Sequence, residues 1–534
     1  LAMNHEYVDH GLLFTDGMAT WTADKVRKSQ AAHGVSIVEV EDKGGKWAVV
    51  NPSPWGRRIT ANTRTEMSGP VVGHALVKTA ADPAGRVVLG TLNNCASSKT
   101  PWGTYLSGEE NFAFYFGGAD TPTPDQRRWG ARKDGLYAWE KHDARFDLKQ
   151  NPNEFHRFGW VVELDPMDPT STPVKRTALG RFNHEGAWPG PVVAGKPIVM
   201  YQGDDARNEY IYKFVSTANW DAADIGGGMA AGDKYLNEGK LYVAKFNSTG
   251  LGEWIELSFS NPLISAYSST SYPGFTFASQ ADIYVHTRLA ADAVGATKMD
   301  RPEWGAVNHA NGEIYFALTN NSASNRTPAT ADAANPRSYN DADGKVGSGN
   351  PNGHIIRFKE QDSLSTALTF TWDIYVFGAE EDMPENVNLS KLTANNSFSS
   401  PDGLWFSKST GICWIQTDDG AFTDETNCML LASVPGTVGD GGEFYVSNSL
   451  TTSAGTTTGI TKTFIGGVLG ESRLRRFLVA PKGAEVTGIT ETPDGKTLFV
   501  NIQHPGENTA AWGATATSLT TESTWPGNGG GLPA

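Results

Sequence analysis

The sequence predicts an all-β protein, more specifically a six-bladed β-propeller with long loop insertions and a few short helices. Three observations lead to this fold class. Apolar runs are short and rich in Val, Ile, Tyr, Phe and Trp, and segments with the 3.6-residue period of a helix are nearly absent. Turn residues are frequent, with 59 glycines and 28 prolines. Short hairpins also recur along the whole chain, which is typical of propellers.

Each expected hairpin has an inner strand, a tight turn and a second strand that ends in polar residues. Five are complete, with inner strands that start near residues 93, 184, 302, 401 and 484. A sixth is represented only by its second strand, at residues 1–7. Because a simple propeller blade needs only about 40–50 residues, the wider spacing of these hairpins predicts long insertions.

Both ends of the chain leave the predicted ring incomplete. The first hairpin lacks an inner strand before Leu1, and the residues after about 504 are rich in Thr, Gly, Ala and Pro. The chain starts inside an expected strand and without Met, so we expect upstream residues that complete the ring. No segment resembles a linker, and we interpret residues 1–534 as one domain.

Composition restricts the partners. The formal net charge is −15, which argues against nucleic acid as a partner because a phosphate backbone requires a basic face. No apolar stretch reaches the roughly 20 residues of a membrane span, so we expect no membrane partner, and we expect a monomer. Cys413 and Cys428 are near enough in sequence to form a disulfide, which leaves Cys95 as a free thiol or a ligand.

Four inner strands begin with a carboxylate at an equivalent position: Glu185, Glu303, Asp402 and Glu485. One such residue alone is most simply a turn or cap residue. Buried carboxylates that face one axis repel one another, and bound cations remove that conflict. Their recurrence at one register therefore predicts a shared metal site.

Cys95 occupies the same place in its hairpin as these carboxylates. A lone cysteine is usually a small buried apolar residue, but the flanks of Cys95 are mostly polar. Carboxylates suit calcium, magnesium or ferric iron, whereas a thiolate suits a softer transition metal. A mixed site is expected if Cys95 is a ligand.

The second strands end in paired acids, Glu109-Glu110 and Asp204-Asp205. Such pairs are either a solvated edge or oxygen ligands for calcium. Arg301 precedes Glu303 by two residues, and residues two apart along a strand share a face. Arg301 thus either forms an ion pair with a neighbouring acid or binds a phosphoryl oxygen.

Taken together, these motifs resemble those of the PhoX-type alkaline phosphatases. The residues that carry the resemblance extend in order over nearly the whole chain and include 4–7, 93–116, 183–186, 300–304, 400–403, 485–488 and 492–507. The resemblance implies a six-bladed propeller with an iron pair and several calcium ions in its central channel. It also implies hydrolysis of phosphomonoesters, and of some diesters, in the periplasm or outside the cell, after export by the twin-arginine route.

The resemblance also assigns site residues. Those that match metal-binding positions are Cys95, Glu185, Asp205, Glu303, Asp402 and Glu485. We also expect Glu109, from the first of the paired acids, to bind metal. Arg301 matches a phosphate-contacting arginine, and we expect Arg301 and Glu303 to act in catalysis. Small phosphate esters are the expected partners.

Without the family resemblance, the residues are also compatible with two other functions. A calcium-dependent propeller lactonase or esterase would need calcium but no iron, and would leave Cys95 without a role. A non-catalytic propeller that binds a protein or glycan through its long loops would tolerate loss of the central acids.

Overall fold

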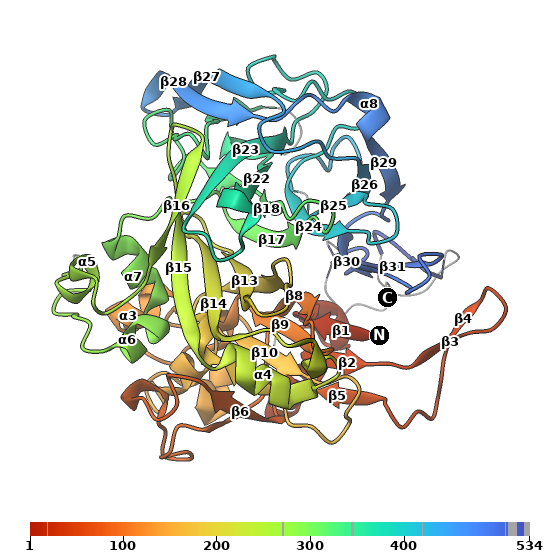
Figure 1. Ribbon diagram of the computed structural model, residues 1–534. Coiled ribbons are helices and arrows are strands. Elements are labelled where there is room, and N and C mark those ends of the chain that lie inside the picture. The colour runs from red at the N-terminus through yellow and green to blue at the C-terminus, as the bar shows by residue number, and fades with distance from the viewer. Residues whose placement is uncertain are drawn as a thin grey trace.

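Short strands dominate the computed structural model of the chain, which describes residues 1–18, 20–269, 272–342, 347–418, 420–507, 509–510 and 521–527. The all-β class with a few short helices is confirmed (Figure 1). The helices are α1 (His10–Leu13), α2 (Ala23–Ala32), α3 (Pro124–Arg128), α4 (Gly228–Leu236), α5 (Pro262–Ser265), α6 (Gln280–Val285), α7 (Thr287–Ala293) and α8 (Gly470–Arg473).

The N-terminal part of the chain forms two sheets. The first has the order β1 (Ala2–His5), β2 (Gly34–Ile37), β5 (Arg57–Ile59). The second has the order β7 (Val87–Leu89), β6 (Arg64–Ser68), β11 (Val174–Arg176), β10 (Val161–Leu164), β9 (Tyr105–Glu109), β8 (Asn94–Lys99). A separate hairpin, β3 (Val40–Asp42) and β4 (Trp47–Val49), extends away from them.

The middle of the chain forms one large sheet from two hairpin units. One unit is β12 (His184–Pro189), β13 (Pro197–Asp204), β14 (Ile211–Asn219), β15 (Gly239–Phe246) and β16 (Leu251–Glu256). The other is β17 (Pro302–Val307), β18 (Ile314–Leu318), β22 (His354–Glu360) and β23 (Thr369–Phe377). The units join where β16 pairs with β23.

The C-terminal part supplies a four-stranded sheet and a hairpin. The sheet has the order β24 (Pro401–Phe406), β25 (Cys413–Thr417), β26 (Met429–Ser433), β29 (Leu474–Val479), and the hairpin is β30 (Glu485–Glu491) with β31 (Leu498–Gln503). Insertions add β19 (Asn321–Ser322), β20 (Tyr339–Asp341) and β21 (Gly347–Asn350), and the long hairpin β27 (Gly442–Thr452) and β28 (Gly455–Ile465).

The first strands of the hairpins follow one another around a common centre. Strand β8 lies against β12, β12 against β17, β17 against β24, and β24 against β30, while β1 lies against β8. The two ends of this series meet, because Gln503 Nε2 donates to Glu6 Oε2 at 3.0 Å and Tyr7 Oη donates to Glu507 Oε1 at 2.6 Å. The arrangement is propeller-like. The count of six blades stays a prediction, because the sheets do not separate into six equal units.

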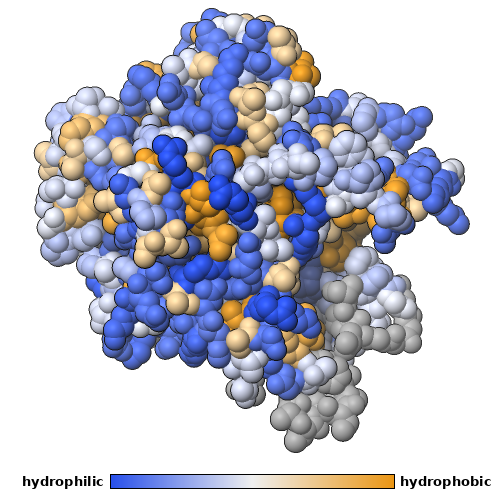
Figure 2. Space-filling view, turned by 90° about the horizontal axis from the view of Figure 1, so that it is seen from below, coloured by the Kyte–Doolittle hydropathy of each residue, from blue (hydrophilic) through white to orange (hydrophobic). Residues whose placement is uncertain are grey.

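Three further observations concern the cysteines, the surface and the membrane. Cys413 is a free cysteine, so it forms no disulfide with Cys428. On the face shown in Figure 2, hydrophilic residues predominate and divide the apolar residues into small patches. Among the described residues, no helix has both the length and the apolar character needed to cross a membrane.

Candidate metal centre

Four inner strands share an irregularity at their start. In β8, β12, β17 and β24 the pairing shifts so that two residues oppose one residue of the partner strand, which is a β-bulge. The first residues of these bulges are Cys95, Glu185, Glu303 and Asp402. Because a bulge redirects the side chain that it contains, the repeated bulge gives these four residues a common direction.

The residue just before three of these strands has a left-handed backbone. The φ angles are 46° at Asn93, 59° at Arg301 and 45° at Ser400. A non-glycine residue in this region costs on the order of 1–3 kcal/mol and persists only when its surroundings hold it there. The backbone is thus strained where the chain enters these inner strands, next to the centre of the ring.

The second strands supply a further set of carboxylates. The residue directly after the strand is Glu6 in β1, Glu110 in β9, Asp205 in β13 and Asp418 in β25. Side chains alternate between the two faces of a strand, so the preceding residue points the other way. Glu109 and Asp204 accordingly form buried ion pairs, with Lys175 at 2.7 Å (Oε1–Nζ) and with Arg288 at 2.5 Å (Oδ1–Nη2).

The two sets of side chains meet in one continuous group, which we call the central cluster. It comprises four overlapping sets whose ligand atoms lie within 4.8 Å of one another: Glu6, Cys95 and Glu110; Glu110, Glu185 and Asp205; Glu185, Glu303 and Asp402; and Asp402, Asp418 and Glu485. Glu185 is fully buried, and Glu303 and Asp402 are nearly so. Asp418 is exposed and marks the solvent side of the central cluster.

Six of the seven residues expected to bind metal lie in the central cluster, and Glu109 does not. The structure instead places Glu109 in the second sheet, with its carboxylate bound by Lys175 and by the backbone N–H groups of Gly159 and Trp160. The neighbouring Glu110 occupies the cluster position. Sequence reasoning also missed Glu6 and Asp418 as site residues, although both follow a second strand as Asp205 does.

Cys95 and Arg301 are held by contacts within the central cluster. The Cys95 Sγ atom lies 3.3 Å from Glu185 Oε1. Arg301 Nη2 lies 2.5 Å from Asp205 Oδ2 and 2.9 Å from Glu303 Oε1. The Arg301 side chain remains 27% exposed, so the only arginine in contact with the described cluster residues also reaches solvent.

Glycines allow the inner strands to approach one another. A Cβ atom on Gly108 of β9 would lie 2.2 Å from the carbonyl oxygen of His184 and 2.4 Å from that of Glu185. A Cβ atom on Gly203 of β13 would lie 2.6 Å from the carbonyl oxygens of Pro302 and Glu303. Each glycine lies opposite the bulge of its own hairpin. Because a glycine has no side chain, the bulge of the next hairpin can approach its backbone closely.

Electrostatics oppose the close approach of so many acids. Burial, followed by repulsion from neighbouring carboxylates, raises the pKa of Glu110, Glu185 and Asp402 well above the usual range. Burial also raises the pKa of the Cys95 thiol, and the nearby Glu185 raises it further. Without compensating positive charge, the central cluster therefore retains protons near neutral pH.

The donors of the central cluster fit metal ions. Glu185 Oε2, Asp205 Oδ1 and Asp402 Oδ1 are buried oxygens without a hydrogen-bond partner among the described residues. Buried polar atoms are normally paired, so three such oxygens in one place fit a site for a positively charged ligand. Carboxylate oxygens suit hard cations, and the Cys95 sulfur suits a transition metal.

The fold and the central cluster define a class, namely propeller-like proteins with acidic clusters that can bind metal ions. The sequence profile of the family described as Alkaline phosphatase PhoX matches residues 1–506. A solved structure of Pseudomonas fluorescens PhoX in complex with vanadate, a transition state analogue, is similar to the chain. It has 39% sequence identity and a TM-score of 0.80, and the match covers 95% of this chain and 81% of that one. Comparison with curated protein sequences gave no match.

The chain belongs to the PhoX family of alkaline phosphatases. It is a hydrolase of phosphomonoesters, as the motifs predicted. The family assignment selects this activity over the lactonase or esterase and over the non-catalytic propeller.

Proposed function

We propose that the central cluster binds iron and calcium and hydrolyses small phosphomonoesters, and some diesters, beside Arg301. The observation that carries this proposal is the mixed donor set, with one thiol among eight carboxylates that meet at one centre. We assign the iron to the Cys95 end of the central cluster, since a thiolate prefers a transition metal. The oxygen-only sets around Asp402 suit calcium.

Bound cations would polarise a phosphoryl oxygen and offset the negative charge that develops in the transition state. The residues of the chain have separate tasks. Glu6, Glu110, Glu185, Asp205, Glu303, Asp402, Asp418 and Glu485 would hold the cations in place as ionised ligands. Cys95 would be a ligand rather than a nucleophile, because its sulfur lies among the ligand carboxylates, 3.3 Å from Glu185 Oε1, where a bound cation would favour the thiolate form.

Arg301 would orient the phosphoryl group. Its contacts with Asp205 and Glu303 both use Nη2. A guanidinium carries five N–H donors in a fixed fork that matches phosphate oxygens. Arg301 thus links a ligand carboxylate to the substrate, and Glu303 supports both the cations and the guanidinium.

The test is the variant Arg301→Ala, studied as metal-loaded protein. We expect weaker inhibition by vanadate and phosphate, by about 10- to 100-fold, because hydrogen bonds to charged groups contribute about 1.5–3 kcal/mol. Metal content should not change. Arg301→Lys should lie between the two, because it keeps the charge but loses the fork. Unchanged inhibition in Arg301→Ala would overturn the assigned role.

We also propose that the enzyme works as a monomer of one domain, in the periplasm or outside the cell, after export by the twin-arginine route. The support is the family resemblance together with the acidic composition. Fractionation of cells that express the full-length gene, followed by sedimentation of the purified enzyme, tests each part. Activity confined to the cytoplasm would contradict the location, and a stable dimer would contradict the monomer.

A further inference from the structure

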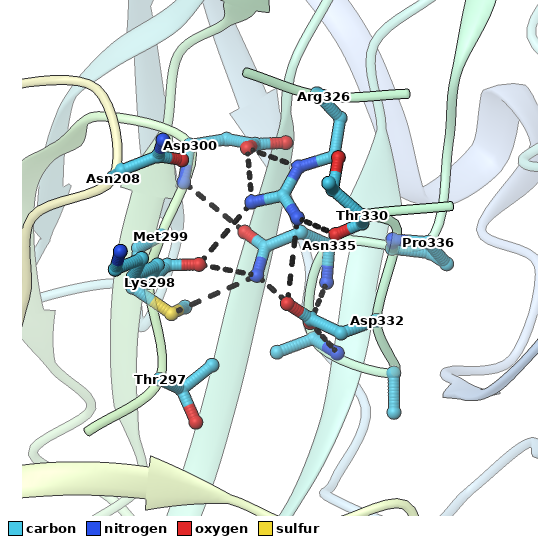
Figure 3. A network of polar contacts seen from close by, with 12 residues as sticks. Asn208, Thr297, Lys298, Met299, Asp300, Arg326, Thr330, Asp332, Asn335 and Pro336 are labelled. Atoms are coloured by element: carbon cyan, nitrogen blue, oxygen red, sulfur yellow. Dashed lines mark hydrogen bonds and ion pairs between the residues drawn. The ribbon is translucent and has the colours of Figure 1, made fainter. Parts of the chain in front are cut away.

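We propose that Asp300, Arg326 and Asn335 are positioning residues that hold Arg301 in its strained backbone conformation and aim its guanidinium at the phosphoryl group. This inference rests on the role proposed above for Arg301. It assigns a task to the insertion between β18 and β22, which supplies Arg326 and Asn335. Figure 3 shows Asp300, Arg326 and Asn335 directed toward one another.

The conformation of Arg301 requires outside support. Its φ angle is 59°, in the left-handed region that residues other than glycine rarely adopt. The next residue is Pro302, and a following proline favours extended backbone instead. Two local preferences therefore oppose the observed geometry, so neighbouring groups must hold it in place.

Asn335 binds the backbone on the N-terminal side of Arg301. Its Oδ1 atom accepts a hydrogen bond from the Asp300 backbone N–H at 3.1 Å, and its Nδ2 atom donates to the Lys298 carbonyl at 3.0 Å. Arg326 Nη2 donates to the same carbonyl at 3.2 Å. The side chain of Asn335 is fully buried, so these bonds do not compete with solvent. The segment that leads into Arg301 is thus fixed from one side by two buried side chains.

The carboxylate of Asp300 is an anchor and not a ligand of the central cluster. Arg326 Nε and Asn321 Nδ2 each donate to its Oδ1 atom at 2.8 Å, and Asn350 Nδ2 donates to its Oδ2 atom at 3.0 Å. Burial raises the pKa of Asp300, but the charge of Arg326, His354 and the hydrogen bonds from Asn350 and Asn321 together outweigh burial and lower the pKa below the usual value. Both oxygens are therefore engaged by side chains outside the central cluster.

Other backbone bonds join this segment to the residues that follow β13 and β18. The Asn208 N–H donates to the Met299 carbonyl at 2.9 Å, and Arg207 forms an isolated antiparallel bridge with Asp300. The Arg301 carbonyl accepts from the Thr319 N–H at 3.2 Å. Since Asp205 lies two residues before Arg207, these bonds bring Arg301 next to the carboxylate with which it pairs. The network therefore sets both the conformation and the position of Arg301.

The decisive comparison uses two buried asparagines with the same kind of bonds. Asn396 Oδ1 accepts from the Thr393 N–H at 2.8 Å, and its Nδ2 atom donates to the Leu474 carbonyl at 3.3 Å. Asn396 is also buried and bonds to other parts of the chain, so Asn396→Ala is a matched control for Asn335→Ala. Each variant is measured as metal-loaded enzyme for its melting temperature, bound metal and vanadate inhibition constant. We expect Asn335→Ala alone to raise the inhibition constant, by about fivefold, with metal content unchanged.

A double variant shows whether Asn335 acts through Arg301. Effects that pass through one residue are not additive, so Asn335→Ala should raise the inhibition constant in the wild type but not in the Arg301→Ala background. Arg326→Lys provides a second test if Asn335→Ala does not fold, because lysine keeps the charge but cannot reach Asp300, Lys298 and Thr330 together.

Each outcome supports or overturns the inference. If Arg301→Ala weakens vanadate binding but neither Asn335→Ala nor Arg326→Lys does, the positioning network is wrong and the role of Arg301 stands. An equal effect of Asn335→Ala in both backgrounds would also overturn the network. If Arg301→Ala leaves vanadate binding unchanged, the proposed role of Arg301 and the network fail together.

Discussion

The Sγ atom of Cys95 lies 3.3 Å from the Oε1 atom of Glu185, although these residues are 90 positions apart in the chain. Each is the first residue of the bulge in its own inner strand. The contact follows from two neighbouring hairpins that present their bulges to the same centre. It also places a soft sulfur donor beside a hard oxygen donor, which is the basis for expecting two kinds of metal ion.

Cys95→Ser tests the sulfur donor. Because a hydroxyl is a poor ligand for a transition metal, we expect this variant to lose iron, most of its activity and the visible colour of a ferric thiolate centre. Calcium should remain partly bound through the carboxylates. Elemental mass spectrometry and an absorption spectrum measure the change. A variant that keeps its iron and its colour would show that Cys95 is not a ligand.

Glu110→Gln and Glu109→Gln form a pair that tests the register of β9. Glu110→Gln removes a metal ligand and also the cost of keeping a buried carboxyl protonated in the metal-free protein, so we expect less bound metal but a more stable metal-free protein. Glu109→Gln leaves buried Lys175 without its counter-charge, and we expect a loss of about 3 kcal/mol of stability. Metal content per folded molecule should not change in Glu109→Gln.

Urea denaturation and elemental analysis of both variants decide the register. The predicted stability changes of the metal-free proteins have opposite signs. If Glu109→Gln lost metal and Glu110→Gln did not, the assignment of the two faces of β9 would be reversed.

Gly108→Ala tests the close approach of neighbouring hairpins. The added Cβ atom would lie 2.2 Å from the His184 carbonyl oxygen, which belongs to the backbone and cannot rotate away. We expect a loss of about 2 kcal/mol of stability, as for other overpacked sites, together with weaker metal binding as Glu185 is displaced. Gly442→Ala is the control, because no atom lies within 4 Å of its added Cβ. Equal melting temperatures for the two variants would contradict this packing.

Removal of metal should make stability depend on pH with a definite sign. Burial, with repulsion from Asp418, raises the pKa of Glu6 from 4.5 to about 7. Between these values the folded metal-free protein keeps a proton that the unfolded chain has lost, so stability falls as pH rises through this range. Glu6 alone accounts for a loss of up to about 3 kcal/mol, at 1.36 kcal/mol per pKa unit.

Metal-loaded protein should not show this loss, since bound cations favour the ionised carboxylates. Denaturation midpoints at pH 5 and pH 8, with and without chelator, measure the difference. A metal-free protein that is equally or more stable at pH 8 would contradict the repulsion within the central cluster.

Part of the central cluster could be predicted from the sequence because it repeats. Glu185, Glu303 and Asp402 follow hairpin starts that can be recognised by their turns and by the strands around them. The choice between Glu109 and Glu110 depended on where β9 ends, and a shift of one residue moves a side chain to the opposite face. The same rule that gave Asp205 would have given Glu110, Glu6 and Asp418 if the strand ends had been known to one residue.

Other features leave no pattern in the sequence. A bulge depends on how two strands pair, so the bulges at Cys95 and Glu185 became visible only in the strand register. In the sequence, the insertion that supplies Arg326 and Asn335 has the composition of a polar loop. Its proposed role could not be predicted, because it depends on contacts with the backbone of Lys298 and Asp300. Such long-range contacts are set by tertiary structure and not by local sequence.

The most direct test of the metal centre is elemental mass spectrometry of the enzyme, purified without chelators, alongside its phosphatase activity. The account predicts iron and calcium in stoichiometric amounts, and loss of activity when they are removed. Full activity toward phosphomonoesters in protein that contains neither metal would contradict it.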